Sequence, residues 1–308
     1  MSDRATIRLL PDGRRLHLSD GPIDLIIGAN GRLSDVRRAY KAAANRFVTI
    51  LDELCAELPL LRSNAVKLRD STPNGAIAKR MLEAVLPYRD RCFITPMAAV
   101  AGAVAEAVLA VMTEAAQLER AYVNNGGDIA MHLASGQLYK IGLVERPQCP
   151  SLFGAVELSA AASVGGIATS GWRGRSFSLG IADAVTVLAE TAAQADAAAT
   201  VIANAVDLPK HPAITRIPAR EIAPDSDLLD LPVTRAVGRL TVFEIAKALE
   251  GGAAAAEELL RQNFIHAVAL NLQGKTHLVQ APLGMSGSSL SVRRRIDAFQ
   301  HEEGVCPK

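Results

Sequence analysis

The most restrictive feature of this sequence is a stretch of low charge in its middle. Residues 92–206 hold only 5 basic and 9 acidic side chains in 115 positions, about half the charge density of the remaining chain. Charged side chains are rarely buried without a partner, so this stretch should supply the core and the floor of any functional site. The chain of 308 residues is 49% hydrophobic but only 4% aromatic. Alanine and small aliphatic side chains must therefore build most of that core.

The overall charge argues against two classes of partner. Lys+Arg 33 against Asp+Glu 32 gives a net charge of +1, whereas nucleic-acid and anionic-membrane binders usually carry a basic surplus. Four scattered cysteines without a CxxC pair fit a reducing compartment. We expect no signal peptide, because residues 1–4 lack an apolar stretch. The apolar run 93–112 contains Pro96 and Glu106, which favours a buried helix over a membrane span. We therefore expect a cytoplasmic protein with neither nucleic acid nor membrane as a partner.

Hydrophobic periodicity predicts helices and strands that alternate without a regular βαβ rhythm, which indicates an α+β fold. We expect a single large domain over 1–308 with a motif-bearing core at about 90–206, a long surface excursion over 209–232 and a mobile tail over 285–308. The predicted helices cover 35–58, 73–86, 97–118, 194–205, 241–249 and 253–262. The predicted strands cover 5–10, 15–18, 22–27, 121–125, 129–133, 138–143, 155–158, 183–189, 265–272 and 276–280.

The first candidate segment for ligand binding lies where the long central helix begins. Thr95 is its expected N-cap, followed by Pro96 and Met97. The unpaired amides of a helix start suit a phosphate or a carboxylate, which makes Thr95 and Met97 candidate cofactor-binding residues. An ordinary capped helix explains the same residues.

The second segment is Asn125-Gly126-Gly127-Asp128. Two glycines between short strands let the backbone turn tightly or approach a ligand closely. An acid directly after them can accept a hydrogen bond from a ribose, an amide or a metal-bound water. All four are candidate cofactor-binding residues, and a plain hairpin turn is the alternative.

The third segment is glycine-rich and runs over 165–175. Thr169, Ser170 and Gly171 are followed by Arg173 and Arg175. Hydroxyls, flexible backbone and guanidinium groups together can cradle a pyrophosphate. The spacing matches neither a Walker loop nor GxGxxG, so this segment alone is weak evidence.

The fourth segment places Asp196 and Thr200 four residues apart, on one face of a predicted helix. A carboxylate beside a hydroxyl forms half of a hard-cation site, and magnesium accepts such sparse protein ligation. The alternative is a solvent-facing aspartate with a threonine bonded to its own helix.

Taken in this order, the four segments resemble the flavin transferase ApbE family, the FAD:protein FMN transferases, and most closely a branch whose reaction is unassigned. The matching residues are Val100-Ala101-Gly102, Gly126-Gly127-Asp128, Ala168-Thr169-Ser170-Gly171, and Ala195-Asp196 with Thr200. The resemblance implies an ApbE-like, T-fold-like α+β fold of mixed sheets packed with helices, with FAD held in a cleft. It also implies Mg²⁺ on Asp196, Thr200 and a main-chain oxygen near Val100, and transfer of FMN to a threonine of an acceptor protein.

Two departures from the family pattern leave the reaction open. The transferases have a lysine where this chain has Ala101, and a histidine and a proline in the region that here reads 176–183. Without a histidine near the phosphate, an acid/base or charge-stabilising group is missing. The expectation is therefore an FAD- or nucleotide-binding protein with Mg²⁺, acting as a transferase or on the pyrophosphate. The alternatives are an enzyme of the same fold that acts on another cofactor or precursor in a biosynthetic pathway, and a non-catalytic binding protein; a homo-oligomer stays open.

Overall fold

The computed structural model describes residues 4–144, 152–280 and 291–294. Strands β1 (Thr6–Leu9), β2 (Leu16–Asp20) and β3 (Ile23–Asn30) form an antiparallel meander, as expected from the turn residues and the alternating pattern. In β2, and in β3 as far as Ile27, every second side chain is buried, because successive side chains of a strand point to opposite faces.

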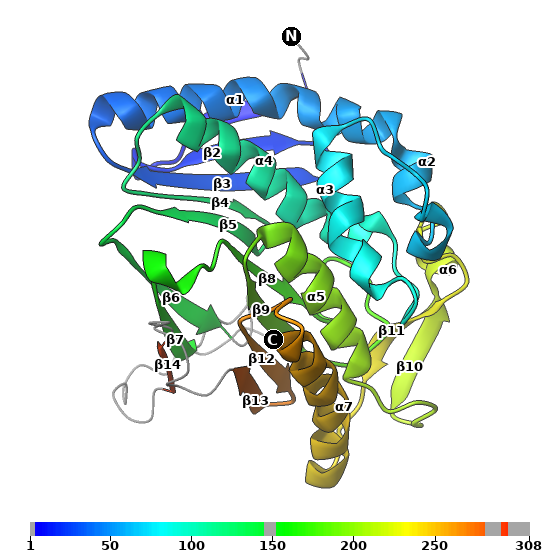
Figure 1. The fold of residues 1–308 in the computed structure, drawn as a ribbon. Helices are drawn as coiled ribbons and strands as arrows, with labels where there is room; N and C mark the ends of the chain where they lie inside the picture. Colours follow the sequence, from blue (N-terminus) through cyan, green and yellow to red (C-terminus); the bar gives the residue numbers. More distant parts are fainter. Residues whose placement is uncertain (1–3, 145–151, 281–290, 295–308) are drawn as a thin grey trace.

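These strands begin a nine-stranded sheet with the order β1-β2-β3-β4-β5-β8-β9-β12-β13 (Figure 1). Every neighbouring pair in it is antiparallel. The pairing between β5 and β8 is short, with two residue pairs. The other strands are β4 (Arg120–Asn125), β5 (Asp128–Leu133), β8 (Gly166–Ser170), β9 (Ala184–Ala189), β12 (Ala267–Leu272) and β13 (Lys275–Gln280).

The long helices pack on one face of this sheet: α1 against β2 and β3, α4 against β4 and β5, α5 against β8 and β9, and α7 against β12 and β13 (Figure 1). The α+β class expected from the sequence is confirmed. The helices are α1 (Leu33–Ala56), α2 (Leu58–Leu61), α3 (Ala76–Val85), α4 (Val100–Ala115), α5 (Ala192–Ala205), α6 (Ala219–Ile222) and α7 (Val242–Arg261), with 3-10 turns η1 (Ala65–Leu68), η2 (Leu86–Tyr88), η3 (Pro96–Ala99) and η4 (Ala160–Ala162).

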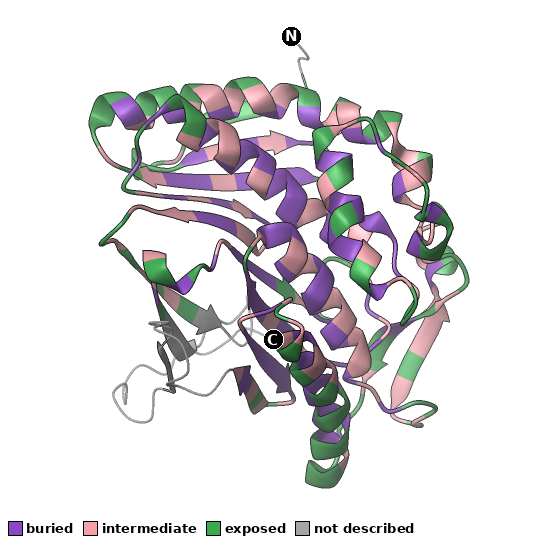
Figure 2. Ribbon diagram, viewed as in Figure 1, coloured by how far each residue is buried: buried purple, intermediate pink, exposed green. Residues whose placement is uncertain are grey.

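Helices α4 and α5 form the centre of the helical layer, and both are buried on nearly every side (Figure 2). The buried positions of α5 are mostly alanine, and those of α4 combine alanine and glycine with valine, leucine and methionine. The small side chains let the two helices and the sheet approach closely. The segment 96–115 is long and apolar enough to cross a membrane. Of an apolar 18-residue stretch within it, 56% is buried here, against α1, α5 and β4 among others. The central low-charge stretch thus builds the core from small side chains.

A smaller sheet of β6 (Leu138–Val144), β7 (Leu152–Ser159) and β14 (Ser291–Arg294) packs on the opposite face of the main sheet. Leu158 meets Met131, Ile167 and Leu188 in a separate hydrophobic cluster, whereas Ala168, the neighbour of Ile167, belongs to the cluster under the helices. The main sheet is therefore covered on both faces at this point.

Three sequence-based expectations need correction. The region 209–232 is more than a surface excursion, because β10 (Ile214–Pro218) pairs with β11 (Pro232–Val237). The two helices expected over 241–249 and 253–262 are the single helix α7. Gly251 and Gly252 lie within it and serve close packing, since a Cβ at Gly252 would lie 2.3 Å from the Val206 side chain. Strand β8 was missed because glycines begin it. Of the tail 285–308, residues 285–290 and 295–308 lie outside the described residues.

Candidate functional site

The turn between β4 and β5 is a tight hairpin, and the start of α4 holds it in place. Gly126 and Gly127 both have positive φ angles, +67° and +117°. The side-chain oxygen of Asn124 accepts a hydrogen bond from the Gly127 amide at 2.8 Å, and Asn125 Nδ2 donates to the Ala101 carbonyl at 3.2 Å. The first and second sequence segments therefore meet in space.

Gly126 has a second reason to be glycine. A Cβ at this position would lie 2.2 Å from the guanidinium of Arg175. Arg175 comes from the loop after β8, so the absence of a side chain lets a cation from the third segment reach the turn of the second.

The end of β8 completes this edge of the sheet. The Thr169 amide donates to Asp128 Oδ1 at 3.1 Å, and the Thr169 hydroxyl shares a hydrogen bond with the Thr186 hydroxyl at 2.9 Å. Ser170 ends the strand and Gly171 follows it directly. The β4–β5 turn with Asp128 and the end of β8 with Thr169 and Ser170 thus form one continuous polar edge, which we call the rim.

Helices α4 and α5 cap each other. The Gly102 amide donates to Asp196 Oδ2 at 3.1 Å, and the Ala193 amide donates to Glu106 Oε1 at 2.6 Å. Each helix therefore supplies a carboxylate to the amides that begin the other. The amides of Gly102 and Ala193 are therefore occupied within the protein.

The two remaining residues of the first segment are engaged within the protein. Thr95 is buried, and its hydroxyl donates to Asp227 and accepts no hydrogen bond from an amide of η3. Met97 is half-buried and packs against the main hydrophobic cluster. The contacts of Thr95 and Met97 are those of structural residues, and their assignment to a cofactor stays a prediction.

Asp128 and Asp196 form a carboxylate pair at this rim. Burial raises the pKa of Asp128 to about 7, while the Thr169 amide and the charge of Arg175 act in the opposite direction. Burial, and then the charge of Asp128, raises the pKa of Asp196 well above its usual range, against the amide hydrogen bonds from Gly102 and Ala101. Asp196 is half-buried, which disfavours the alternative interpretation of the sequence, a solvent-facing aspartate.

The donor set of this pair fits a hard divalent cation. Two carboxylates, with the Thr200 hydroxyl one turn along α5, offer only oxygen ligands, which Mg²⁺ prefers. A cation beside them would favour the ionised forms that burial and mutual repulsion disfavour. The described residues contain no group of three or more His, Cys, Asp or Glu side chains that could hold a metal. Water or ligand oxygens would therefore have to complete the coordination shell. From the sequence, Asp128 was a candidate for cofactor binding and not for direct metal ligation; its place directly after two glycines was the signal that singled it out.

The raised pKa values predict a pH dependence of folding stability for the metal-free protein. Between about pH 4 and pH 7 the folded state holds a proton on Asp128 that the unfolded chain has released. The free energy of unfolding should therefore fall as the pH rises through this window, and more steeply than in an Asp128→Asn variant. Urea unfolding in EDTA at several pH values measures the difference. The charged groups that face Asp128, which are Arg175 and Asp196, are the same in both proteins. Equal slopes for wild type and variant would contradict the assignment.

The reciprocal caps predict a second stability effect. Glu106→Ala should lower the free energy of unfolding by about 1 kcal/mol because the Ala193 amide loses its acceptor. Glu106→Gln keeps an acceptor oxygen and should retain most of the stability. Glu114→Ala, an exposed position on the same helix, is the matched control. Equal effects of Glu106→Ala and Glu114→Ala in urea unfolding would argue against the cap.

Comparison with known proteins gives matches over most of the chain. The family model described as AbpE bacteria matches residues 7–278. A UPF0280 protein of Methanopyrus kandleri is 36% identical over 154 residues, which cover 50% of this chain and 59% of the relative. A UPF0280 protein of Methanothrix thermoacetophila is 36% identical over 160 residues, covering 51% of this chain and 64% of the relative. The matched part is thus less than two thirds of either relative.

Among solved structures, a single-residue variant of the flavin transferase ApbE from Vibrio cholerae matches 87% of this chain and 98% of its own chain. The sequence identity is 14% and the TM-score is 0.37.

Proposed function

The chain belongs to the AbpE bacteria family, and from that premise we propose that it binds FAD or a related nucleotide together with Mg²⁺ at the Asp128–Asp196 pair. The resemblance to ApbE recognised in the four sequence motifs is confirmed at the level of the family. The observation that supports the proposal is the convergence of these two carboxylates, 68 positions apart in the chain, beside a glycine turn and the end of β8.

Each group at the rim has a separate task in this proposal. Asp128, Asp196 and Thr200 hold the cation, and Thr169, Ser170 and Gly171 line the place of the nucleotide phosphates. Arg175, which reaches Gly126, adds a positive charge beside those phosphates. When bound, Mg²⁺ supplies charge neutralisation and Lewis-acid polarisation at the pyrophosphate.

A direct binding experiment tests this proposal. Purified protein is titrated with FAD in the presence of Mg²⁺ and, separately, of EDTA, with flavin fluorescence and the thermal midpoint as readouts. We expect saturable binding and a raised midpoint only with Mg²⁺, because the ligand stabilises the folded state by mass action. ADP and FMN titrated in parallel identify the part of the nucleotide that is recognised. A midpoint unchanged by FAD plus Mg²⁺ would end the proposal.

A second function deserves testing: an enzyme of the same fold that acts on another cofactor or precursor without transferring flavin. Two observations favour it. First, Ala101 takes the position at which the transferases have a lysine, and its carbonyl accepts a hydrogen bond from Asn125. Second, in the region 176–183, where the transferases have a histidine, Ser178 is buried and its hydroxyl donates a hydrogen bond to Asn204.

The reaction itself separates the two functions. The protein is incubated with FAD, Mg²⁺ and a threonine-bearing acceptor protein, and covalent flavin is read as in-gel fluorescence. Transfer of FMN would establish the first function and remove the second. Binding of FAD without transfer is the result we expect from the missing lysine and histidine. A cytoplasmic location belongs to the same proposal, and an acceptor protein is a partner only if FMN is transferred.

A further inference from the structure

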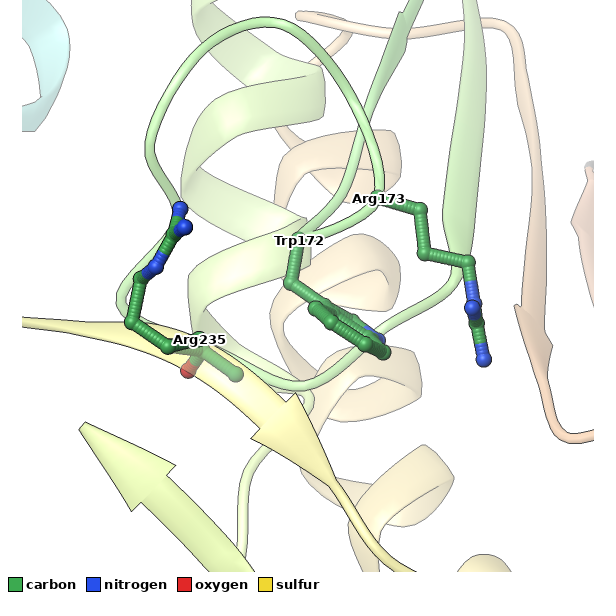
Figure 3. A pocket seen from close by; sticks show the side chains of 4 residues that line it. Trp172, Arg173 and Arg235 are labelled. Carbon is green, nitrogen blue, oxygen red and sulfur yellow. The ribbon is translucent and has the colours of Figure 1, made fainter.

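A separate pocket of about 350 Å³ lies between the loop after β8 and strand β11. Trp172 and Arg173 line it from the loop, and Thr234 and Arg235 line it from the strand (Figure 3). In Figure 3, Trp172 lies between the two arginines. The volume is near the lower end of the range for small-molecule sites, which is about 300–1,000 Å³. It suits a small metabolite rather than a dinucleotide.

The loop that forms this pocket points its side chains in two directions. Trp172 Nε1 and Arg173 Nε both donate to Asp183 Oδ1, at 3.1 Å and 2.5 Å. Arg175, by contrast, reaches the β4–β5 turn at Gly126. The pocket is thus separate from the carboxylate pair, although one loop contributes to both.

The two arginines of the pocket differ in their charge balance. Arg173 is paired with Asp183, and its guanidinium lies over the Trp172 ring, 4.5 Å from the ring centroid. Arg235 is exposed and has neither an ion pair nor a hydrogen bond within the described ranges 4–144, 152–280 and 291–294. A free guanidinium beside an already neutralised one leaves the pocket with a surplus of positive charge.

Thr234 supplies an unsatisfied polar group at the same place. The residue is 4% exposed, and within the described part of the chain its hydroxyl has no hydrogen-bond partner. Its amide donates to the Ser178 carbonyl at 2.9 Å, which fixes the residue in the strand. A buried hydroxyl without a partner costs stability, so its retention here is explained if a ligand atom supplies the missing bond.

We propose that this pocket binds the oxyanion group, a phosphate or a carboxylate, of a small molecule. Arg235 forms the ion pair, since a guanidinium presents a planar fork that matches both groups. The Thr234 hydroxyl donates a further hydrogen bond, and the Trp172 ring packs against the rest of the molecule. This site goes beyond the nucleotide site proposed above and uses none of its residues.

The chain offers a direct probe of the pocket, because Trp172 is its single tryptophan. We would titrate the full chain at low ionic strength with inorganic phosphate and, in a separate arm, with acetate, and follow tryptophan fluorescence against KCl at equal ionic strength. A saturable change in either arm that KCl does not produce is the expected result, and the arm that responds identifies the group. No saturable change in either arm overturns the proposal.

Variants connect the signal to the assigned residues. Arg235→Ala should weaken the response by about tenfold or more, as expected for loss of a charge-assisted pair, and Thr234→Val should weaken it less. Arg239→Ala, an exposed arginine four positions along, is the matched control and should bind as wild type. An unchanged response in Arg235→Ala, with a wild-type thermal midpoint, overturns the assignment.

The same titration separates this pocket from the nucleotide site. Asp196→Asn should keep the tryptophan response to the oxyanion, whatever happens to Mg²⁺-dependent nucleotide binding. Arg235→Ala should keep nucleotide binding. If Asp196→Asn abolishes the oxyanion response, the pocket is part of the nucleotide site and the proposal of a separate site is wrong.

Discussion

Asp196→Asn is expected to remove Mg²⁺-dependent nucleotide binding while leaving the fold intact. The asparagine side-chain oxygen can still accept the hydrogen bond from the Gly102 amide, so the cap of α4 is kept. What is lost is the negative charge and one anionic oxygen ligand. Since loss of even an outer partner of a metal site costs about 10–100-fold in affinity, loss of a direct ligand should weaken Mg²⁺ binding by about 100-fold or more.

Without metal, the Asp196→Asn variant should be at least as stable as the wild type, although its Mg²⁺-dependent nucleotide binding is lost. Burial and the charge of Asp128 both disfavour the ionised form of Asp196, as the raised pKa shows. A neutral side chain of the same shape removes that cost, so the free energy of unfolding at pH 7.5 should stay equal or rise. A protein that becomes more stable as it loses its ligand fits a functional residue better than a structural one.

Two further variants decide between a metal ligand and a helix cap. Asp196→Ala removes both charge and acceptor, and should lose binding together with about 1 kcal/mol of stability. Asp230→Asn, an exposed residue paired with Arg220, is the control for removal of a carboxylate. Isothermal titration with Mg²⁺ and nucleotide gives affinities, and urea unfolding gives stabilities. Wild-type binding by Asp196→Asn would show that Asp196 only caps α4, and the proposed function would lose its central residue.

Local patterns in the sequence predicted the parts of the site that local chemistry determines. Asn-Gly turn residues between alternating strands predict the β4–β5 hairpin, and the pairing of Asn125 with Asp128 confirms it. The low charge of residues 92–206 correctly predicted that α4 and α5 are core helices. The motif order indicated the family, and Asp128 and Asp196 come together even though neither motif specifies the other.

The parts that sequence reasoning missed depend on contacts between distant residues. Glu106 and Ala193 are 87 positions apart, and Thr95 and Asp227 are 132 apart, so no periodicity or capping pattern relates them. Thr95 is a residue type that favours the N-cap, but its hydroxyl donates to Asp227 instead of accepting from a helix amide, because tertiary partners compete with local ones. The glycines of α7 indicate a helix end by propensity, while packing against Val206 explains why the helix continues.

The second large effect concerns Gly102, at the point where α4 and α5 cross. A Cβ here would lie 2.2 Å from the Ala192 carbonyl oxygen and 2.7 Å from the Ala193 nitrogen, and both are backbone atoms that cannot move as a side chain can. Gly102→Ala would therefore push apart the two helix starts that cap each other. Alanine favours a helix by propensity, by about 1 kcal/mol over glycine, so a local argument predicts stabilisation and the packing argument predicts the reverse.

We expect packing to prevail, with a loss of about 3 kcal/mol or more in the free energy of unfolding, because overpacking against backbone leaves no rotamer to relieve it. Gly174→Ala is the matched control, since its Cβ would meet only the Gly171 carbonyl, at 3.2 Å. Urea unfolding of both variants makes the comparison. Because the Gly102 amide also donates to Asp196, the variant should lose Mg²⁺-dependent nucleotide binding even under conditions where it remains folded. A Gly102→Ala protein as stable as wild type, with binding intact, would mean that the α4–α5 crossing is wider than described and that Asp196 does not depend on it for its position.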